Sequence, residues 1–261
     1  MSIAIKAGFI FTSAILLLFG AFHILFYQYI KKGRFSVNIR DLPVLEYFDK
    51  VIKHCAEAKR PAMYSVGDGL YGLTDSEGGP LAVAALALLN YFAEECVKND
   101  VRILMIIPLG EVLPLARENV HRAALRANKP EYYNENDIWF VPGPYAYSFA
   151  MYETMQTQKP GGNILMGCYA GFAGIGAVET GNFVGAINIA SGARYINSAP
   201  FMVTCEYTLL GPEMFVAGTF VSKNPTALGA VQSMDILALA SGLIIFVGLL
   251  LSVVGIKIPF Y

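Results

Sequence analysis

Two long apolar segments without formal charge, one near each end of the chain, restrict the possible folds more than any other feature. They are AGFIFTSAILLLFGAFHILFY at residues 7–27 and ILALASGLIIFVGLLLSVVGI at residues 236–256. A helix rises about 1.5 Å per residue, so about 20 apolar residues cross a hydrocarbon core of about 30 Å. We therefore predict one transmembrane helix at each end and expect the lipid bilayer as a partner.

The charged residues are concentrated between these two segments. Only 15% of the 261 residues are charged, against about 25% in a typical soluble domain. The formal net charge is −1, which gives no support to a nucleic-acid-binding function. We predict three parts: an N-terminal anchor at 1–34, an α/β domain at 35–229 and a C-terminal anchor at 230–261.

The residues that flank the first apolar segment indicate its orientation. Bulky residues follow it in HILFYQYIKKGRF, with no small-residue cleavage site, so we expect an uncleaved anchor. Lys31, Lys32, Arg34 and Arg40 come after the segment, and only Lys6 precedes it. The positive-inside rule then predicts a two-pass protein of the cell membrane, with a cytoplasmic central domain and both termini outside.

Strand-like and helix-like stretches alternate along the central part. The amphipathic stretch at 41–61 opens it and ends at Pro61. Predicted strands follow at 62–66, 101–108, 137–143, 163–169, 185–191 and 200–208, and the predicted helices include 80–99, 111–128 and 144–158. This alternation predicts a mostly parallel, Rossmann-like sheet flanked by helices.

Residues 163–193 allow a second interpretation, because Glu179 is their only formal charge. They could form a third membrane segment. However, Asn163, Asn182, Asn188 and several glycines make this stretch a poor spanning helix. A buried α/β core is the favoured interpretation.

A glycine-rich loop follows the first predicted strand in MYSVGDGLYGLTDSEGGP. Gly67, Gly69 and Gly72 have the G-x-G-x-x-G order of a dinucleotide-binding loop. The strong helical pattern, however, begins only near Pro80, whereas such a loop needs a helix N-terminus within the motif. Turn formation and helix capping are the alternative role for these residues.

Acidic residues also weaken the nucleotide interpretation of this loop. Asp68, Asp75 and Glu77 place negative charge where a phosphate would lie. Glu111 follows the second strand, where a ribose-binding carboxylate could lie, but it comes about 40 residues after the motif rather than ~20. The candidate ligand residues here are Gly67, Asp68, Gly69, Gly72 and Glu111.

Glu179 is a further candidate, in the glycine-rich stretch GCYAGFAGIGAVETGNFVGA. A carboxylate buried among apolar residues has a raised pKa and is a candidate functional group. The alternatives are a structural ion pair with Arg194 and a position in a subunit interface.

No catalytic or metal-binding pattern is present. There is no G-x-S-x-G or H-E-x-x-H sequence, and Ser65 and Ser191 have no marked histidine partner. The four cysteines form no C-x-x-C pair and the three histidines are scattered, so we expect no metal and no cofactor.

Small residues form a stripe in the second apolar segment. Ser241, Gly248, Ser252 and Gly255 share one helical face, and the first segment carries Ser13 and Gly20 seven residues apart. Small residues let membrane helices approach closely, although glycine is also simply frequent in such helices. The stripe predicts packing between the anchors or with a neighbouring subunit. The role of His23 in the first segment stays open.

The stretch VGAINIASGARYINSAPFMVTCEYTLLGPEMFVAGTFVSKNPTALGAVQSMD resembles an uncharacterised family of prokaryotic membrane-anchored proteins. The resemblance implies a membrane-bound α/β domain and carries no reaction, cofactor or catalytic residue. The leading function hypothesis is a non-enzymatic assembly subunit that forms homo-oligomers or docks in a membrane complex. The alternative is a membrane-tethered nucleotide- or small-ligand-binding sensor or enzyme that uses the loop at 67–72.

Overall fold

The computed structural model describes residues 7–32, 43–68, 72–74, 78–169, 171–192, 194–222 and 225–253. Contacts between residues divide the chain into two units. Met1–Ile39 and Lys223–Tyr261 make up the terminal unit, and Arg40–Ser222 make up the α/β unit.

A parallel sheet of six strands lies at the centre of the α/β unit, in the order β3-β2-β1-β4-β5-β6. The strands are β1 (Ala62–Gly67), β2 (Ile103–Ile107), β3 (Ile138–Phe140), β4 (Gly162–Cys168), β5 (Ile187–Gly192) and β6 (Tyr207–Leu210). This order is that of a doubly wound sheet, with its topological switch point between β1 and β4. The predicted α/β fold is confirmed.

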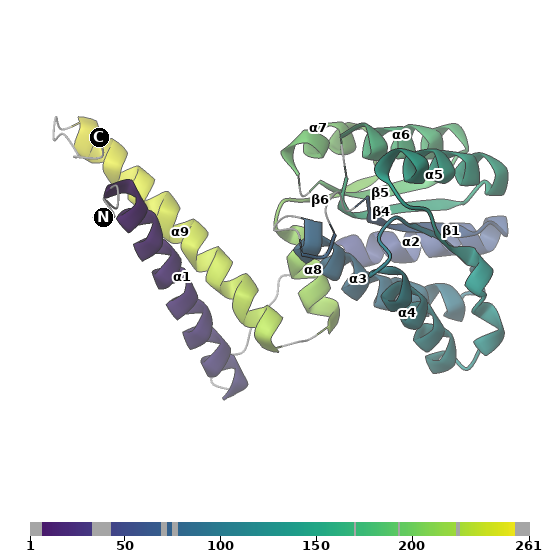
Figure 1. Cartoon of the computed structure of the whole chain (residues 1–261), viewed down its shortest axis with the longest axis horizontal. Helices are drawn as coiled ribbons and strands as arrows, with labels where there is room; N and C mark the ends of the chain where they lie inside the picture. The colour runs from purple at the N-terminus through teal and green to yellow at the C-terminus, as the bar shows by residue number, and fades with distance from the viewer. Residues whose placement is uncertain are drawn as a thin grey trace, which may run out of the picture. The chain divides into compact units, whose positions relative to one another are not determined.

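Helices cover both faces of the sheet (Figure 1). One face carries α2 (Pro43–Ala58), α3 (Gly78–Lys98), α4 (Leu113–Arg126) and α8 (Glu213–Ser222). The other face carries α5 (Pro144–Gln158), α6 (Gly171–Phe183) and α7 (Tyr195–Thr204), and short 3-10 turns at Pro130–Tyr132 and Glu135–Asp137 precede β3. Strands β1, β2 and β4 are buried throughout. Their continuous apolar runs therefore follow from burial on both faces.

The α2 helix confirms the amphipathic pattern of the sequence. Val44, Phe48, Val51, Ile52 and Cys55 are buried at helical spacing. The interpretation of 163–193 as a buried core is also confirmed, because this stretch forms β4, α6 and β5.

The predicted strand at 200–208 is wrong. Residues up to Thr204 belong to α7, and the strand β6 begins only at Tyr207. A short apolar run does not distinguish a buried strand from a helix by periodicity. Here Phe201 is buried while Met202 and Val203 are exposed, which is the one-sided burial of a helix.

One helix of the described residues is long and apolar enough to span a membrane, and it is α3. However, 61% of its apolar stretch is buried, and Leu88, Leu89 and Phe92 are fully buried against the sheet. The hydroxyl of Tyr64 on β1 donates a hydrogen bond to Ala85 O on α3 at 2.7 Å. We therefore assign α3 to the core.

The terminal unit contains two long helices, α1 (Ala7–Lys31) and α9 (Pro225–Val253), which lie side by side and antiparallel (Figure 1). Their described apolar stretches, Leu16–Tyr29 and Ala227–Leu243, are shorter than a membrane span. The membrane helix at each end thus stays a prediction.

Candidate functional site

Two glycines shape the carboxyl ends of β1 and β4, where the register between the strands shifts. Gly67 has φ +91° and Gly167 has φ +107°. A Cβ on Gly67 would lie 2.3 Å from Cys168 O, and one on Gly167 would lie 2.1 Å from Val66 O. Only glycine fits such contacts at positive φ. The backbones of the two paired strands therefore approach very closely at the switch point, where doubly wound sheets bind ligands. We call this place the β1–β4 crossing.

Three hydroxyl groups form a buried network directly below this crossing. The Ser65 Oγ on β1 shares a hydrogen bond with the Tyr147 hydroxyl on α5. It also accepts the Tyr169 hydroxyl at 2.8 Å and the Gly67 N–H at 3.2 Å. Ser65 is 1% exposed, and both tyrosines are fully buried. Because a serine hydroxyl has two lone pairs and one proton, its own proton is assigned to the Tyr147 oxygen. The phenol proton of Tyr147 is then directed to another acceptor.

Asp68 and Asn197 lie beside this network. Asp68 is 3% exposed, and its N–H donates to Cys168 O at 2.9 Å. The Asn197 side chain, in the first turn of α7, donates to Tyr169 O at 3.0 Å. Asn197 is 1% exposed, and no donor of the described residues reaches its Oδ1. Carboxylate, amide and phenol groups therefore meet at the ends of β1, β4 and β5.

Burial and charge keep these phenols protonated. Desolvation raises the pKa of Tyr147 and of Tyr169 well above the ordinary value, and the negative charge of Asp68 adds to the rise while the hydrogen bond to Ser65 opposes it. The pKa of Tyr152 is raised by desolvation and by Asp68 as well, against a hydrogen bond to Ser148. Near neutral pH these tyrosines act as hydrogen-bonding groups rather than as bases.

The chemistry of the cluster suits recognition by hydrogen bonding. No group of three or more His, Cys, Asp or Glu side chains with metal-binding geometry is found within the described ranges. Three of the four cysteines offer no reactive thiolate: burial raises the pKa of Cys55 and of Cys205 to about 12 and that of Cys96 well above its ordinary value. A thiol with so high a pKa is a weak nucleophile.

The structure brings several predicted site residues to the same edge of the sheet. Gly67 and Asp68 belong to the cluster just described. Glu111 contacts the glycine-rich loop, since its Oε1 accepts the Leu73 N–H at 2.6 Å. A Cβ on Gly72 would lie 2.8 Å from that oxygen. Glu111 thus binds loop backbone at the position where the sequence suggested a ribose contact. Gly69 lies outside the described residues.

Glu179 is not part of this site, and its predicted burial is wrong. The side chain is exposed on α6. Its apolar neighbours in sequence, Ala177 and Val178, face the core, while the helix turns Glu179 toward solvent. The reason for considering it a functional carboxylate therefore no longer applies.

A family model described as "Domain of unknown function (DUF6754)" matches residues 6–260. The chain belongs to this DUF6754 family. No curated protein and no solved structure matched the chain. The resemblance to an uncharacterised family is confirmed, and the family description assigns no activity, cofactor or site residue to the DUF6754 domain.

The sequence interpretation missed Tyr147, Tyr169 and Asn197 and dismissed Ser65. The sequence did contain a signal for Ser65 and Tyr169. Each is a polar residue at the carboxyl end of an apolar strand, and such residues lie close together at one edge of a parallel sheet. Asn197 lies five residues after β5. Tyr147 gives no such signal, because only the packing of α5 brings it to Ser65.

The small residues of the DUF6754 terminal helices lie in mixed surroundings. Ser13 is exposed, and a Cβ on the half-buried Gly20 would meet nothing within 4 Å. Ser241 is exposed and its hydroxyl donates to Ala238 O at 2.9 Å.

The described contact between the two helices is at Gly229, whose Cβ would lie 3.2 Å from Tyr27 Cα. The side-chain surroundings of Gly248 and Ser252, and all of Gly255, lie outside the described residues. The predicted packing stripe therefore stays a prediction.

Proposed function

We propose that this protein is a membrane-anchored ligand-binding protein. Its α/β unit binds a small molecule with amino or hydroxyl groups and no phosphate at the crossing of β1 and β4. The single observation that carries this proposal is the buried Ser65–Tyr147–Tyr169 network beside Asp68, at the switch point of a doubly wound sheet.

The charge around the crossing supports the choice of ligand class. In a dinucleotide site the pyrophosphate lies at the loop after the first strand. Here that position has Asp68, whose negative charge reaches three tyrosines, and Glu111 holds the same loop. Two carboxylates disfavour a phosphate and favour hydrogen-bond donors, such as an amine or a hydroxyl.

Exposed apolar side chains support the membrane anchors. Several described side chains of α1 and α9 are large, apolar and more than half exposed: Leu16, Leu17, Ile24, Leu239, Leu243, Ile245 and Phe246. Apolar surface of this extent is covered in soluble proteins. Helices of 25 and 29 residues rise about 37 and 43 Å, enough to cross about 30 Å of hydrocarbon.

Four basic residues at and after the end of the first apolar segment support the proposed orientation: Lys31, Lys32, Arg34 and Arg40. By the positive-inside rule they favour a cell-membrane protein with the α/β unit in the cytoplasm and both termini outside.

Thermal unfolding of the full chain in detergent tests the ligand proposal. A panel of amines, amino alcohols, polyols, nucleotides, dinucleotides and acyl-CoA compounds is added at millimolar concentration. We expect an amine or polyol to raise the unfolding midpoint, and we expect Asp68→Asn to remove that rise. The control variant is Glu206→Gln, which changes an exposed carboxylate near β6. A rise with nucleotides that persists in Asp68→Asn would contradict the proposal.

Assembly is the second candidate function, and exposed aromatic and aliphatic side chains on the α5–α7 face favour it. Phe149, Phe172, Phe183 and Val203 are all more than half exposed there. Contiguous apolar surface often marks an interaction site. Multi-angle light scattering of the detergent-solubilised chain is expected to give an oligomer, and Phe183→Ser combined with Val203→Ser is expected to shift it to monomer. A wild-type monomer at micromolar concentration rules this candidate out.

A further inference from the structure

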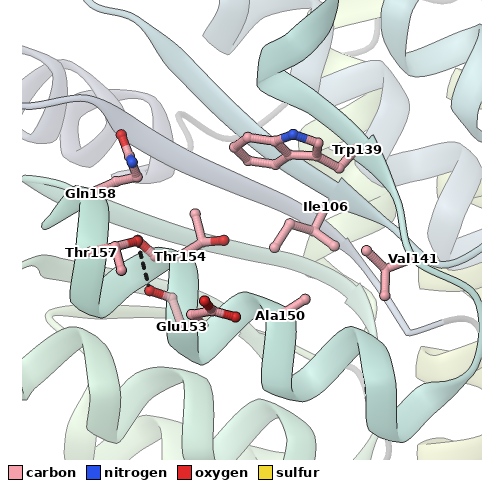
Figure 2. Close-up of a pocket in the computed structure, with 8 residues that line it drawn as sticks. All are labelled: Ile106, Trp139, Val141, Ala150, Glu153, Thr154, Thr157 and Gln158. Atoms are coloured by element: carbon pink, nitrogen blue, oxygen red, sulfur yellow. Dashed lines mark hydrogen bonds between the residues drawn. The ribbon is translucent and has the colours of Figure 1, made fainter.

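A groove of about 260 Å³ lies between α5 and the β3 edge of the sheet. Figure 2 shows its two walls. One wall comes from the sheet and consists of Ile106 on β2, Trp139 on β3 and Val141 directly after β3. Side chains of α5, including Glu153 and Thr154, form the opposite wall.

The α5 wall is one stripe of the helix. Ala150, Glu153, Thr154, Thr157 and Gln158 line the groove, and their spacing of three and four residues places them on a single face. Tyr147, Met151 and Met155 lie on the neighbouring face and are fully buried against the sheet. The groove is therefore separate from the hydroxyl network, although the same helix contributes to both.

The groove combines an aromatic ring with one negative charge. Of the described residues that line it, only Glu153 carries a formal charge. Glu153 is exposed, and no cationic side chain within the described part of the chain lies within ion-pair distance of it. The hydroxyl of Thr157 donates to the backbone Glu153 O at 2.9 Å, so its proton is already used inside the helix.

We infer that this groove binds a small organic cation, such as a methylated ammonium group. Indole is the best aromatic partner for a cation, and the Glu153 carboxylate supplies the opposite charge. Ile106, Val141 and Ala150 offer apolar surface to methyl groups. The volume is below the roughly 300–1,000 Å³ of pockets for drug-sized ligands, which suits a compact head group. This second site is independent of the ligand proposed for the β1–β4 crossing.

Trp139 makes the proposal directly measurable, because it is the single tryptophan of the chain. Its fluorescence in the full-length protein is titrated with choline chloride, with sodium chloride added to keep the ionic strength constant. The detergent is a polyoxyethylene ether, which contains neither an ammonium group nor a sugar. The neutral isostere 3,3-dimethyl-1-butanol is titrated in parallel, and saturation-transfer NMR of the ligand methyl groups provides a second readout.

Saturable binding of choline, with binding of the neutral isostere at least about tenfold weaker, is the expected result. Glu153→Gln should weaken choline binding by about two- to fivefold, because an exposed ion pair contributes up to about 1 kcal/mol. The matched control Glu206→Gln, at the opposite edge of the sheet, should leave it unchanged.

The inference is overturned by no choline signal in either readout, by equal binding of the neutral isostere, or by full affinity in Glu153→Gln. Binding of a methyl glucoside in place of choline would also overturn it and would indicate a saccharide groove.

Discussion

Two polar clusters lie against the same sheet of the α/β unit, and they differ in charge and in position. Each has one buried amide oxygen that no donor of the described residues reaches, Asn197 Oδ1 in one and Asn163 Oδ1 in the other. One is the hydroxyl cluster at the carboxyl ends of the strands, formed by Ser65, Asp68, Tyr147, Tyr169 and Asn197. The other is the asparagine cluster at α6, formed by the buried Asn163 and Asn188 with the exposed Asn182 at its rim. The comparison distinguishes buried polar groups that stabilise the fold from buried polar groups that form a binding site.

The asparagine cluster bonds mainly to itself and to α6. Asn163 donates to Asn188 at 2.7 Å and to Ala177 O at 3.2 Å, and Asn188 donates to Asn182 at 2.6 Å. A Cβ on Gly181 would lie 2.2 Å from the Asn188 oxygen, so α6 packs directly on the amides. The cluster carries no ionisable group. Its role is to fix α6 against β4 and β5.

The hydroxyl cluster differs in charge and in position. It contains a carboxylate, it lies at the β1–β4 crossing, and the loop that follows β1 continues from it. Polar groups at this edge of a doubly wound sheet are placed to meet a ligand. The following predictions, from the largest expected effect to the smallest, test whether the two clusters have the roles assigned here.

Gly167→Ala should have the largest effect, because it removes the close crossing that forms the hydroxyl cluster. The new Cβ would lie about 2.1 Å from a backbone oxygen at φ +107°. We expect a loss of unfolding free energy of about 3 kcal/mol or more, measured by chemical unfolding with Trp139 fluorescence. Gly211→Ala is the control: φ is +53° and nothing lies within 4 Å, so it should cost only about 1 kcal/mol.

Asn188→Ala should destabilise the protein without changing ligand binding. It leaves the buried amide of Asn163 without its partner Asn188, which costs about 2 kcal/mol. The exposed Asn136→Ala should change the unfolding free energy by less than about 0.5 kcal/mol. If Asn188→Ala also abolished binding at the β1–β4 crossing at a temperature where it is folded, the two clusters would not be independent.

Alkaline pH should affect the hydroxyl cluster and not the asparagine cluster, which has no titratable group. The pKa values of Tyr147 and Tyr169 are raised in the folded state, so above about pH 10 the unfolded chain loses phenol protons that the folded chain retains. Unfolding free energy should therefore fall as pH rises above about 10, by at most about 1.4 kcal/mol per pH unit for each group. Tyr147→Phe should reduce this slope, whereas Asn188→Ala should leave it unchanged.

Glu111→Gln should have the smallest effect on stability. Its bond to the Leu73 N–H is exposed, and loss of the charge should cost less than about 1 kcal/mol. The informative readout is specificity: with less negative charge at the loop, a nucleotide should bind more tightly than to wild type. An unfolding midpoint that stays insensitive to nucleotides in this variant would show that Glu111 does not exclude phosphate.

The order of strands and helices could be predicted from the sequence to a large extent. Continuous apolar runs such as ILMII predicted buried parallel strands, and amphipathic spacing predicted α2 and α4. The error at 200–208 arose because the apolar run there has no clear period. Only the packing of Phe201 among the buried side chains on the α5–α7 face of the sheet selects a helix.

What the sequence determined by itself was therefore local: the alternation of strands and helices, the glycine-rich loop, the acidic character of that loop and the apolar ends of the chain. Tertiary structure decided which strands are neighbours, and with that the site. Ser65 and Tyr147 are 82 residues apart, and Ser65 and Tyr169 are 104 apart. Tyr169 meets Ser65 because β4 pairs with β1, and Tyr147 meets it because α5 packs on the sheet. No local pattern encodes this pairing, since it depends on how the whole chain buries its apolar surface on both faces of the sheet.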